Sequence, residues 1–375
     1  MPNKLLVYLD KFVWKTDKIA RFCKSRNGKR LGIFSTVILC CTVVSYMGTD
    51  ALKNIPIIKS AYYDTIVANC PQFVDFLSAD IGKAVFSITL LAVCICYLFR
   101  GLYRPFATLI AHSTMGHDLS VLYEPLKKSF WFVRKYIGIQ LPSKNASEDQ
   151  VITAVCAQDE SFKQIQEGNW CSTVFYYGVA HTPLVFRLGY QWGQTGKIRF
   201  LHRFRSTEDA QEFQELPPYV EEKMAFRRSD RLDELNFNSK SKHMLVSIAT
   251  TYPISEEDLA CIDPSNTMSR YDMQVDLMGY DFFNSYQKIH SYADRIIHDL
   301  RERVKERGIE TIHLVISSSV PFTFYLAQHM NTHQFPQIIV YHFDCGKYTW
   351  GIDVTEPDAK KAIRWAGSAI DSTAV

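Results

Sequence analysis

Three consecutive serines in this sequence have the type and position of residues that bind a phosphorylated ligand. Ser317, Ser318 and Ser319 follow an apolar run and precede Pro321, a pattern typical of a helix that begins here. Serine hydroxyls and the free N–H groups of a first helical turn are donors for phosphate. The same residues are equally typical of an ordinary N-cap. The motif G-x-S-x-G is absent, so we expect no catalytic nucleophile here.

Two further polar segments occupy comparable places after apolar runs. His181 and Thr182 stand before Pro183, in the position that the serines hold before Pro321. The run SIATTYP ends in two threonines and a tyrosine, whose hydroxyls and aromatic ring could contact a ribose and a base. The same residue types are also common in turns, so a structural role explains them as well. These residues are Thr250, Thr251 and Tyr252.

Basic residues offer a third kind of contact. Arg199, Arg203 and Arg205 alternate along one predicted strand, so their side chains share a face and could meet phosphates. A solvated strand edge explains the same alternation.

Two histidine pairs have spacings that could suggest a metal site. His112 and His117 lie five residues apart, and His329 and His333 share one face of a predicted helix. Neither an HExxH motif nor a nearby carboxylate completes either set, so we expect no metal.

Strands and helices alternate around these segments. Buried strands are predicted at residues 171–180, 197–204, 243–253, 311–319 and 336–344, and helices at 181–194, 285–307 and 320–331. Apolar, β-branched strands that alternate with helices predict a parallel sheet covered on both faces. The fold class is therefore α/β, a Rossmann-like domain in two related halves. Ligands of such sheets bind beyond the carboxyl ends of the strands.

The N-terminal part has a different composition. The uncharged run 31–49 has about the 20 residues that a membrane-spanning helix requires, and 84–99, flanked by Lys83 and Arg100, is predicted as a second span. Residues 1–30 carry nine Lys or Arg against two Asp, with apolar residues at roughly helical spacing. This pattern suits an amphipathic helix on a lipid surface, and a solvated basic tail is the alternative.

Charge decides the expected topology and excludes some partners. Basic residues flank both spans on the side of the termini, and Asp50, Asp64, Asp75 and Asp80 lie between the spans, so both termini are expected in the cytoplasm. The net charge of +3 leaves about −4 on residues 31–375, which argues against binding long nucleic acids. No CxxC pair is present, which suits a reducing compartment.

These features divide the chain into four parts. We expect a basic segment at 1–30, two spans with a short loop at 31–104, a proline-containing connector at 105–150 and the α/β domain at 151–375.

The order of four segments resembles the SAVED domain, a fused pair of CARF-like Rossmann halves. They are FYYGVAHTPLVFRLGYQWG, SIATTYPIS, IETIHLVISSSVPFTFYLAQHMN and FPQIIVYHFD. SAVED domains sense cyclic oligonucleotides in bacterial CBASS anti-phage defence, and one subgroup carries two N-terminal transmembrane helices, which this chain resembles. No nuclease or TIR-like region is present, so the enzymatic outputs of other SAVED proteins are not implied.

The resemblance implies a membrane effector rather than an enzyme. On this interpretation a cyclic oligonucleotide, a trinucleotide by resemblance, bridges the two halves and favours association of protomers. We expect that association to be head to tail, because heterologous contacts let an assembly grow without closing. Two spans cannot enclose a pathway within one protomer, so we expect the assembled spans to disrupt the bacterial inner membrane, in abortive infection. No further cofactor is implied. A membrane-tethered phosphodiesterase that degrades the nucleotide is the rival interpretation. The expected ligand-binding residues are Tyr176, His181, Thr182, Arg203, Thr250, Thr251, Tyr252, Ser317, Ser318, Ser319 and Pro321.

Overall fold

A computed structural model describes most of the chain after residue 105. The described residues are 106–117, 119, 129–142, 144–167, 173–193, 198–205, 212–220, 232–330 and 334–366. They belong to one compact unit, apart from Phe106 at its margin. The expected basic segment and both expected spans lie outside the described residues. Within the described part, no helix is long and apolar enough to cross a bilayer.

The first sheet has five strands in the order β2-β1-β3-β4-β5. β1, β3 and β4 run parallel, and β5 is antiparallel to β4. Nearly every residue of β1 and β3 is buried, as expected for central strands that are covered on both faces. The strands are β1 (Phe106–Ser113), β2 (Trp131–Gly138), β3 (Val174–Val179), β4 (Ile198–His202) and β5 (Gln214–Glu215).

The second sheet has seven strands in the order β12-β11-β10-β9-β7-β8-β6. Its centre is parallel, from β10 through β9 and β7 to β8, whereas both margins pair antiparallel. The strands are β6 (Asp233–Asn236), β7 (His243–Ala249), β8 (Ser269–Gln274), β9 (Thr311–Ser317), β10 (Gln337–Asp344), β11 (Lys347–Asp353) and β12 (Ile363–Trp365).

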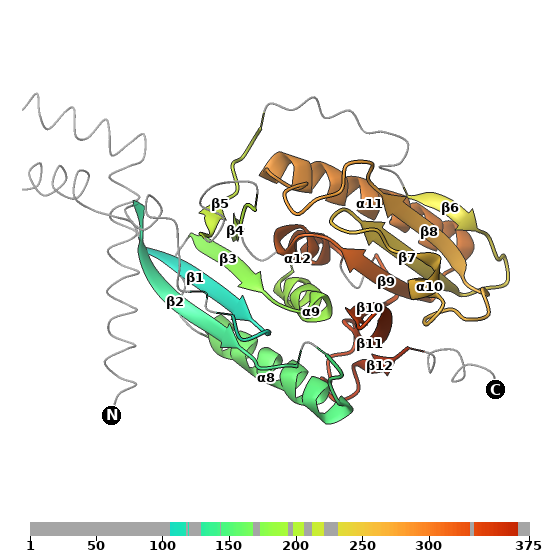
Figure 1. Cartoon of the computed structure of the whole chain (residues 1–375), viewed down its shortest axis with the longest axis horizontal. Helices are drawn as coiled ribbons and strands as arrows, with labels where there is room; N and C mark the ends of the chain where they lie inside the picture. The colour runs from blue at the N-terminus through green and yellow to red at the C-terminus, as the bar shows by residue number, and fades with distance from the viewer. Residues whose placement is uncertain are drawn as a thin grey trace, which may run out of the picture. The chain divides into compact units, whose positions relative to one another are not determined.

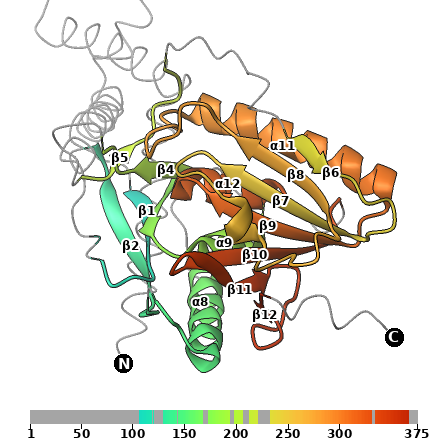
Figure 2. The same cartoon turned by 45° about the vertical axis from the view of Figure 1, so that its right-hand side comes forward.

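Two helices lie between the sheets, α9 (Thr182–Trp192) and α12 (Val320–His329) (Figure 1). α12 contacts β3 and β4 of the first sheet, and α9 contacts β10 and β11 of the second. Figure 2 shows α8 (Glu148–Glu167) beside the first sheet and α11 (Tyr286–Arg307) along the second. A short helix, α10 (Glu256–Leu259), begins with a capping box formed by Ser255 and Asp258. The largest apolar cluster contains residues of both sheets and of these longer helices, so the two halves share one core.

α9 and α12 cross at a glycine. A Cβ atom built on Gly189 would lie 2.6 Å from the carbonyl oxygen of Phe324 and 3.0 Å from the Cβ of Ala327. Because the nearest atom belongs to the backbone of α12, it cannot move aside as the end of a flexible side chain could. Gly189 therefore permits the close approach of the two helices.

We expect Gly189→Ala to destabilise the domain by about 1–3 kcal/mol, since overpacking forces the helices apart. The midpoint of urea unfolding measures this change. Gly279→Ala is the matched control, because a Cβ at Gly279 meets no atom within 4 Å. An unchanged midpoint for Gly189→Ala would show that α9 and α12 separate at little cost.

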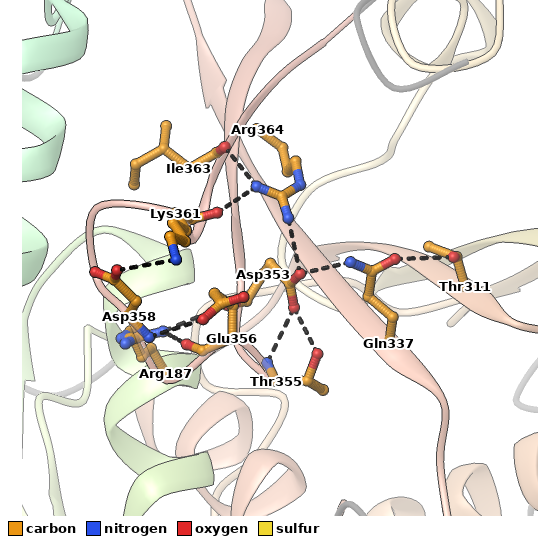
Figure 3. A network of polar contacts seen from close by, with 10 residues as sticks. All are labelled: Arg187, Thr311, Gln337, Asp353, Thr355, Glu356, Asp358, Lys361, Ile363 and Arg364. Carbon is orange, nitrogen blue, oxygen red and sulfur yellow. Dashed lines mark hydrogen bonds and ion pairs between the residues drawn. The ribbon is translucent and has the colours of Figure 1, made fainter. Parts of the chain in front are cut away.

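A buried arginine joins α9 to other elements of the domain. The Arg187 side chain is 1% exposed, and its guanidinium binds the Asp159 carboxylate on α8 through Nε at 3.0 Å and Nη2 at 2.6 Å. Its Nη1 atom donates to the carbonyls of Asp353 and Glu356 at 3.3 and 3.0 Å. Figure 3 shows that Arg364 also binds Asp353, so this network connects α9 with the chain around β11 and β12.

The predicted elements between residues 171 and 344 are confirmed in type and order. β3, α9 and β4 form one strand–helix–strand unit and β9, α12 and β10 form the other, and each helix has proline in its first turn. The range 105–150, expected as a connector, supplies β1, β2 and the start of α8. Its polar end caps a helix: the Ser147 hydroxyl accepts the Gln150 N–H, and the Gln150 side chain accepts the Ser147 N–H.

Candidate functional site

The carboxyl ends of strands from both sheets meet at one cavity. Residues at the ends of β3, β4, β7 and β9 line it, together with the first residues of α9 and α12. The cavity has a volume of about 600 Å³. Parallel strands direct their carboxyl ends to the same edge, and helices that follow them begin there, so the fold itself places free N–H groups at this cavity.

Eight of the eleven expected binding residues line the cavity. They are Thr182, Arg203, Thr251, Tyr252, Ser317, Ser318, Ser319 and Pro321. The structure therefore brings together residues that are up to 139 positions apart in the sequence.

The serine turn is held in place by the end of β7. The Tyr252 backbone N–H donates to the Ser317 hydroxyl at 3.0 Å, and the Thr250 hydroxyl donates to the Ser318 hydroxyl at 2.8 Å. The Thr250 and Thr251 N–H groups both donate to the Ser317 carbonyl. These bonds fix Ser317 and Ser318 to the neighbouring strand.

Ser319 differs from the two serines before it. It is the N-cap residue of α12, yet its side chain makes no cap bond. Its Oγ atom is buried and has no hydrogen-bond partner in the described residues. The His181 side chain likewise makes no cap bond at the start of α9. Neither helix start is therefore capped by a side chain, which leaves room for a phosphate oxygen to accept a backbone N–H bond there. Pro183 and Pro321 contribute no N–H group, and the Leu184 N–H already donates to the His181 carbonyl.

Arginines enter the cavity after β4, but not all three that the sequence suggested. β4 ends at His202, so Arg203 and Arg205 lie beyond the strand, where they line the cavity. Arg199 instead pairs with the Glu215 carboxylate through two nitrogens and lies over the Phe175 ring. The expectation that the three side chains act on one face is therefore wrong, because the strand ends between them.

Three expected binding residues lie behind the cavity wall. Tyr176 is fully buried, its hydroxyl is 2.9 Å from His112 Nδ1, and its ring packs against Phe324 at a centroid distance of 4.2 Å. His181 Nδ1 is 2.7 Å from the Thr114 hydroxyl, and Thr250 is fully buried. Side chains buried in this way act on a ligand only through their neighbours.

Burial keeps the histidines behind the site uncharged near neutral pH. It lowers the pKa of His181 to about 4 and that of His342 to about 3, and the nearby His181 contributes to the latter shift. The two rings meet edge to face at a centroid distance of 4.7 Å. Desolvation also lowers the pKa of His112 to about 3. In the described residues, no group of three or more His, Cys, Asp or Glu could hold a metal ion.

Several cavity residues have no signal in the sequence that would select them. Tyr280 lies in the irregular segment after β8, and Met115 and His117 come from the range expected as a connector. Phe343 had a weak signal, because it lies at the end of a predicted strand that finishes in VYHFD. Residues of this kind come together only when both sheets have formed.

The arrangement defines a Rossmann-like α/β protein with a cavity at the carboxyl edge of its sheets, where ligands of such folds bind. The model of the SAVED family, described as the SMODS-associated and fused to various effectors sensor domain, matches residues 158–354. This match covers more than half of the chain, and the chain belongs to the SAVED family.

Solved structures to which this chain is similar include receptors from two bacteria. The Cap4 SAVED/CARF-domain containing receptor of Acinetobacter baumannii with the cyclic trinucleotide 3′3′3′-cAAA has a TM-score of 0.45 and 11% identity, over 75% of this chain and 60% of that one. The same receptor with 2′3′3′-cAAA has a TM-score of 0.44 and 10% identity, at the same coverage. The Moraxella osloensis Cap4 receptor has a TM-score of 0.37 and 11% identity, over 70% of this chain and 53% of that one.

This chain therefore spans at most 60% of the length of these receptors. Among curated proteins, none matches the sequence.

Proposed function

We propose that the cavity binds a cyclic oligonucleotide and that the chain is a sensor of this second messenger. The observation that supports this most is the convergence of two helix starts, two arginines and exposed aromatic rings on one cavity, in a chain of the SAVED family. Helix N–H groups and arginines suit phosphates, and rings suit bases. A cyclic trinucleotide is the ligand class to test first, because the family resemblance implies it.

Calorimetric titration tests this proposal. The full-length chain in detergent micelles would be titrated with 3′3′3′-cAAA, 2′3′3′-cAAA and cyclic dinucleotides. We expect saturable binding of at least one compound, and loss of that binding in the double variant Arg203→Ala/Arg205→Ala. Lys360→Ala removes an exposed cation elsewhere and is the control. A folded chain that binds none of the compounds would contradict the proposal.

Ser319→Ala is expected to weaken nucleotide binding roughly three- to tenfold, as loss of one hydrogen bond of about 0.5–1.5 kcal/mol implies. The variant should keep the melting temperature of the wild type, because the Ser319 hydroxyl has no partner in the described residues. Ser318→Ala is the comparison, since it removes the acceptor of the buried Thr250 hydroxyl and should lower stability as well. Unchanged affinity in Ser319→Ala would remove this hydroxyl from the site.

We further propose that the sensor controls a membrane effector. Two spans, at 31–49 and 84–99, would place the chain in the bacterial inner membrane, in contact with lipid and with both termini in the cytoplasm. Ligand binding would favour a head-to-tail oligomer, provided that the ligand binds the assembled state more tightly than the free protomer. Clustered spans would then disrupt the membrane in anti-phage abortive infection.

Thiol labelling of intact cells tests the topology. A membrane-impermeant maleimide should label Cys70, which lies between the expected spans, and should spare Cys345. Cys345 is exposed, so its protection would report the compartment and not burial. Permeabilised cells should show labelling of both, and Cys70→Ser identifies the first signal. Labelling of Cys345 in intact cells would contradict the topology.

Dye entry tests the effector. Cells that make the nucleotide should take up a membrane-impermeant dye only when they contain the full-length chain. A chain without residues 1–104 should bind nucleotide without causing dye entry. Equal toxicity of this truncated chain would mean that the membrane is not the target.

One observation favours the rival phosphodiesterase. His202 lines the cavity beside Arg203, and its Nε2 atom is 3.4 Å from an Asp281 carboxylate oxygen, an arrangement that could serve a general base. Chromatography of 3′3′3′-cAAA after incubation with the chain separates the two functions. Linear product that disappears in His202→Gln would support the enzyme, and intact ligand would support the sensor.

A further inference from the structure

A stacked arginine and tyrosine stand on one wall of the cavity. The guanidinium carbon of Arg205 lies 3.3 Å from the centroid of the Tyr280 ring. The Tyr252 ring meets Tyr280 edge to face, with centroids 5.3 Å apart and planes at 85°. The three residues come from the segments after β4, β7 and β8, and all three line the cavity. We call this group the Arg205–Tyr280–Tyr252 platform.

The backbone around the platform is fixed by hydrogen bonds. The Asp281 carboxylate accepts the Arg205 N–H through both oxygens, at 3.1 and 3.0 Å, and it belongs to the residue next to Tyr280. The Tyr252 N–H is held by the Ser317 hydroxyl. Planar groups that are already held in place lose little conformational freedom when a ligand binds, so the platform is organised before ligand arrives.

The platform presents flat surfaces to the cavity. Tyr252 is 54% exposed although it lies at the rim of a cavity lined by polar groups. Arg205 is exposed as well, and it lines the same cavity. Nucleobases stack on aromatic rings and on guanidinium planes, whereas a phosphate approaches the N–H edge of a guanidinium and has no use for a ring.

We infer that the Arg205–Tyr280–Tyr252 platform is a subsite for one nucleobase of the ligand. This inference rests on the proposed binding of a cyclic oligonucleotide. It divides the cavity into two parts: the serine turn and the helix starts contact phosphates, and the platform contacts a base. Because every base has a flat face, the platform contributes affinity more than it selects one base.

Two substitutions test the subsite by calorimetry with 3′3′3′-cAAA, 2′3′3′-cAAA and cyclic di-AMP as probes. Tyr280→Leu removes the ring and should lower the affinity of the tightest probe about tenfold. Arg205→Lys keeps the charge but loses the planar group, and it should lower affinity similarly. Tyr219→Leu is the matched control, because Tyr219 is exposed outside the cavity and its variant should bind as the wild type does.

Salt dependence distinguishes base stacking from phosphate binding. Tyr280→Leu removes no charge, so the slope of log affinity against log salt concentration should equal that of the wild type. A probe with 2-aminopurine in place of adenine should be quenched on binding to the wild type and less quenched in Tyr280→Leu. Melting temperatures show whether each variant is folded.

The outcomes separate the two proposals. If the wild type binds a probe, and folded Tyr280→Leu and Arg205→Lys bind it equally well, the platform is not a base subsite and the proposed function stands. If the wild type binds none of the probes, the proposed function fails and the subsite fails with it.

Discussion

Acid should unfold this domain over a narrow range between pH 6 and pH 4. Four buried histidines cause the expected loss of stability, because burial lowers the pKa of each one. The pKa falls from 6.5 to about 4 for His181 and to about 3 for His112, His313 and His342.

The sign follows from proton uptake by the unfolded chain. Below pH 6.5 the unfolded chain protonates these side chains, and the folded domain does not do so until the pH reaches 3 to 4. The free energy of unfolding is therefore unaffected by these histidines above pH 6.5. It decreases as the pH falls from 6.5 toward the pKa values of the folded domain. Each group contributes about 1.4 kcal/mol per pH unit, so four together give roughly 5 kcal/mol per unit near pH 5. The free energy of unfolding of a domain is about 5–15 kcal/mol, so a slope of this size removes it within a few pH units.

Urea unfolding at half-unit pH steps measures this slope. His313→Gln should reduce it by about 1.4 kcal/mol per pH unit, whatever the substitution does to stability at pH 7. The same substitution at His290, which is exposed on α11, is the matched control. A stability that stays flat from pH 6.5 to pH 4.5 would contradict the prediction.

Arg187→Ala is expected to destabilise the domain by about 3–5 kcal/mol, the second large effect. The substitution leaves the Asp159 carboxylate without its bidentate partner and removes the donor to two carbonyls around β11. Removing one partner of a buried ion pair is strongly destabilising, because the remaining charge has lost its compensation. Thermal unfolding of the purified chain measures the loss.

Two further variants separate the causes. Arg187→Lys keeps the charge and loses the forked geometry, so it should fall between wild type and Arg187→Ala. Arg301→Ala, at an exposed position of α11, should lower stability by less than about 1 kcal/mol. A loss of that size in Arg187→Ala would mean that the ion pair contributes little, and that apolar contacts and the hydrogen bonds of Gln158 and Gln191 hold α8 against α9.

The parts of the fold that can be predicted from the sequence are those with strong local patterns. β3, β9 and β10 are apolar runs, and α11 has a clear apolar face, with Ser285 as its N-cap and Gly308 as its C-cap. The prolines of α9 and α12 mark where these helices begin. In each case the signal lies within the element and does not depend on partners from elsewhere in the chain.

Two of the elements that were not predicted depend on distant partners. β6 is short, mostly polar and mostly exposed, so its sequence has no strand pattern, and it forms by pairing with β8. β12 has three half-buried residues and forms on β11. α8 did have a local signal, the capping box of Ser147 and Gln150, in a polar stretch that also suits a domain boundary.

The residues of the candidate site also differ in whether the sequence alone can identify them. Ser317, Ser318 and Ser319 can be selected from the sequence because strand, turn and proline follow one another. Tyr280 cannot be selected, since its place beside Arg205 results from two loops of different sheets coming together. Exposure also needs the structure: Tyr176, within β3, is fully buried, whereas Tyr252, three residues after β7, is exposed and lines the cavity.

The common core of the two halves decides how the polypeptide could be divided. Residues of both sheets belong to one apolar cluster, and α9 and α12 are packed between the sheets. A fragment that ends after β5 would expose the apolar surface that α12 covers, and a fragment that begins at β6 would lack α9. Separately produced, the two fragments should be insoluble or unfolded, and co-expressed they should reassemble. A chain cut at this point is therefore suited to a fragment-complementation reporter whose signal requires both halves.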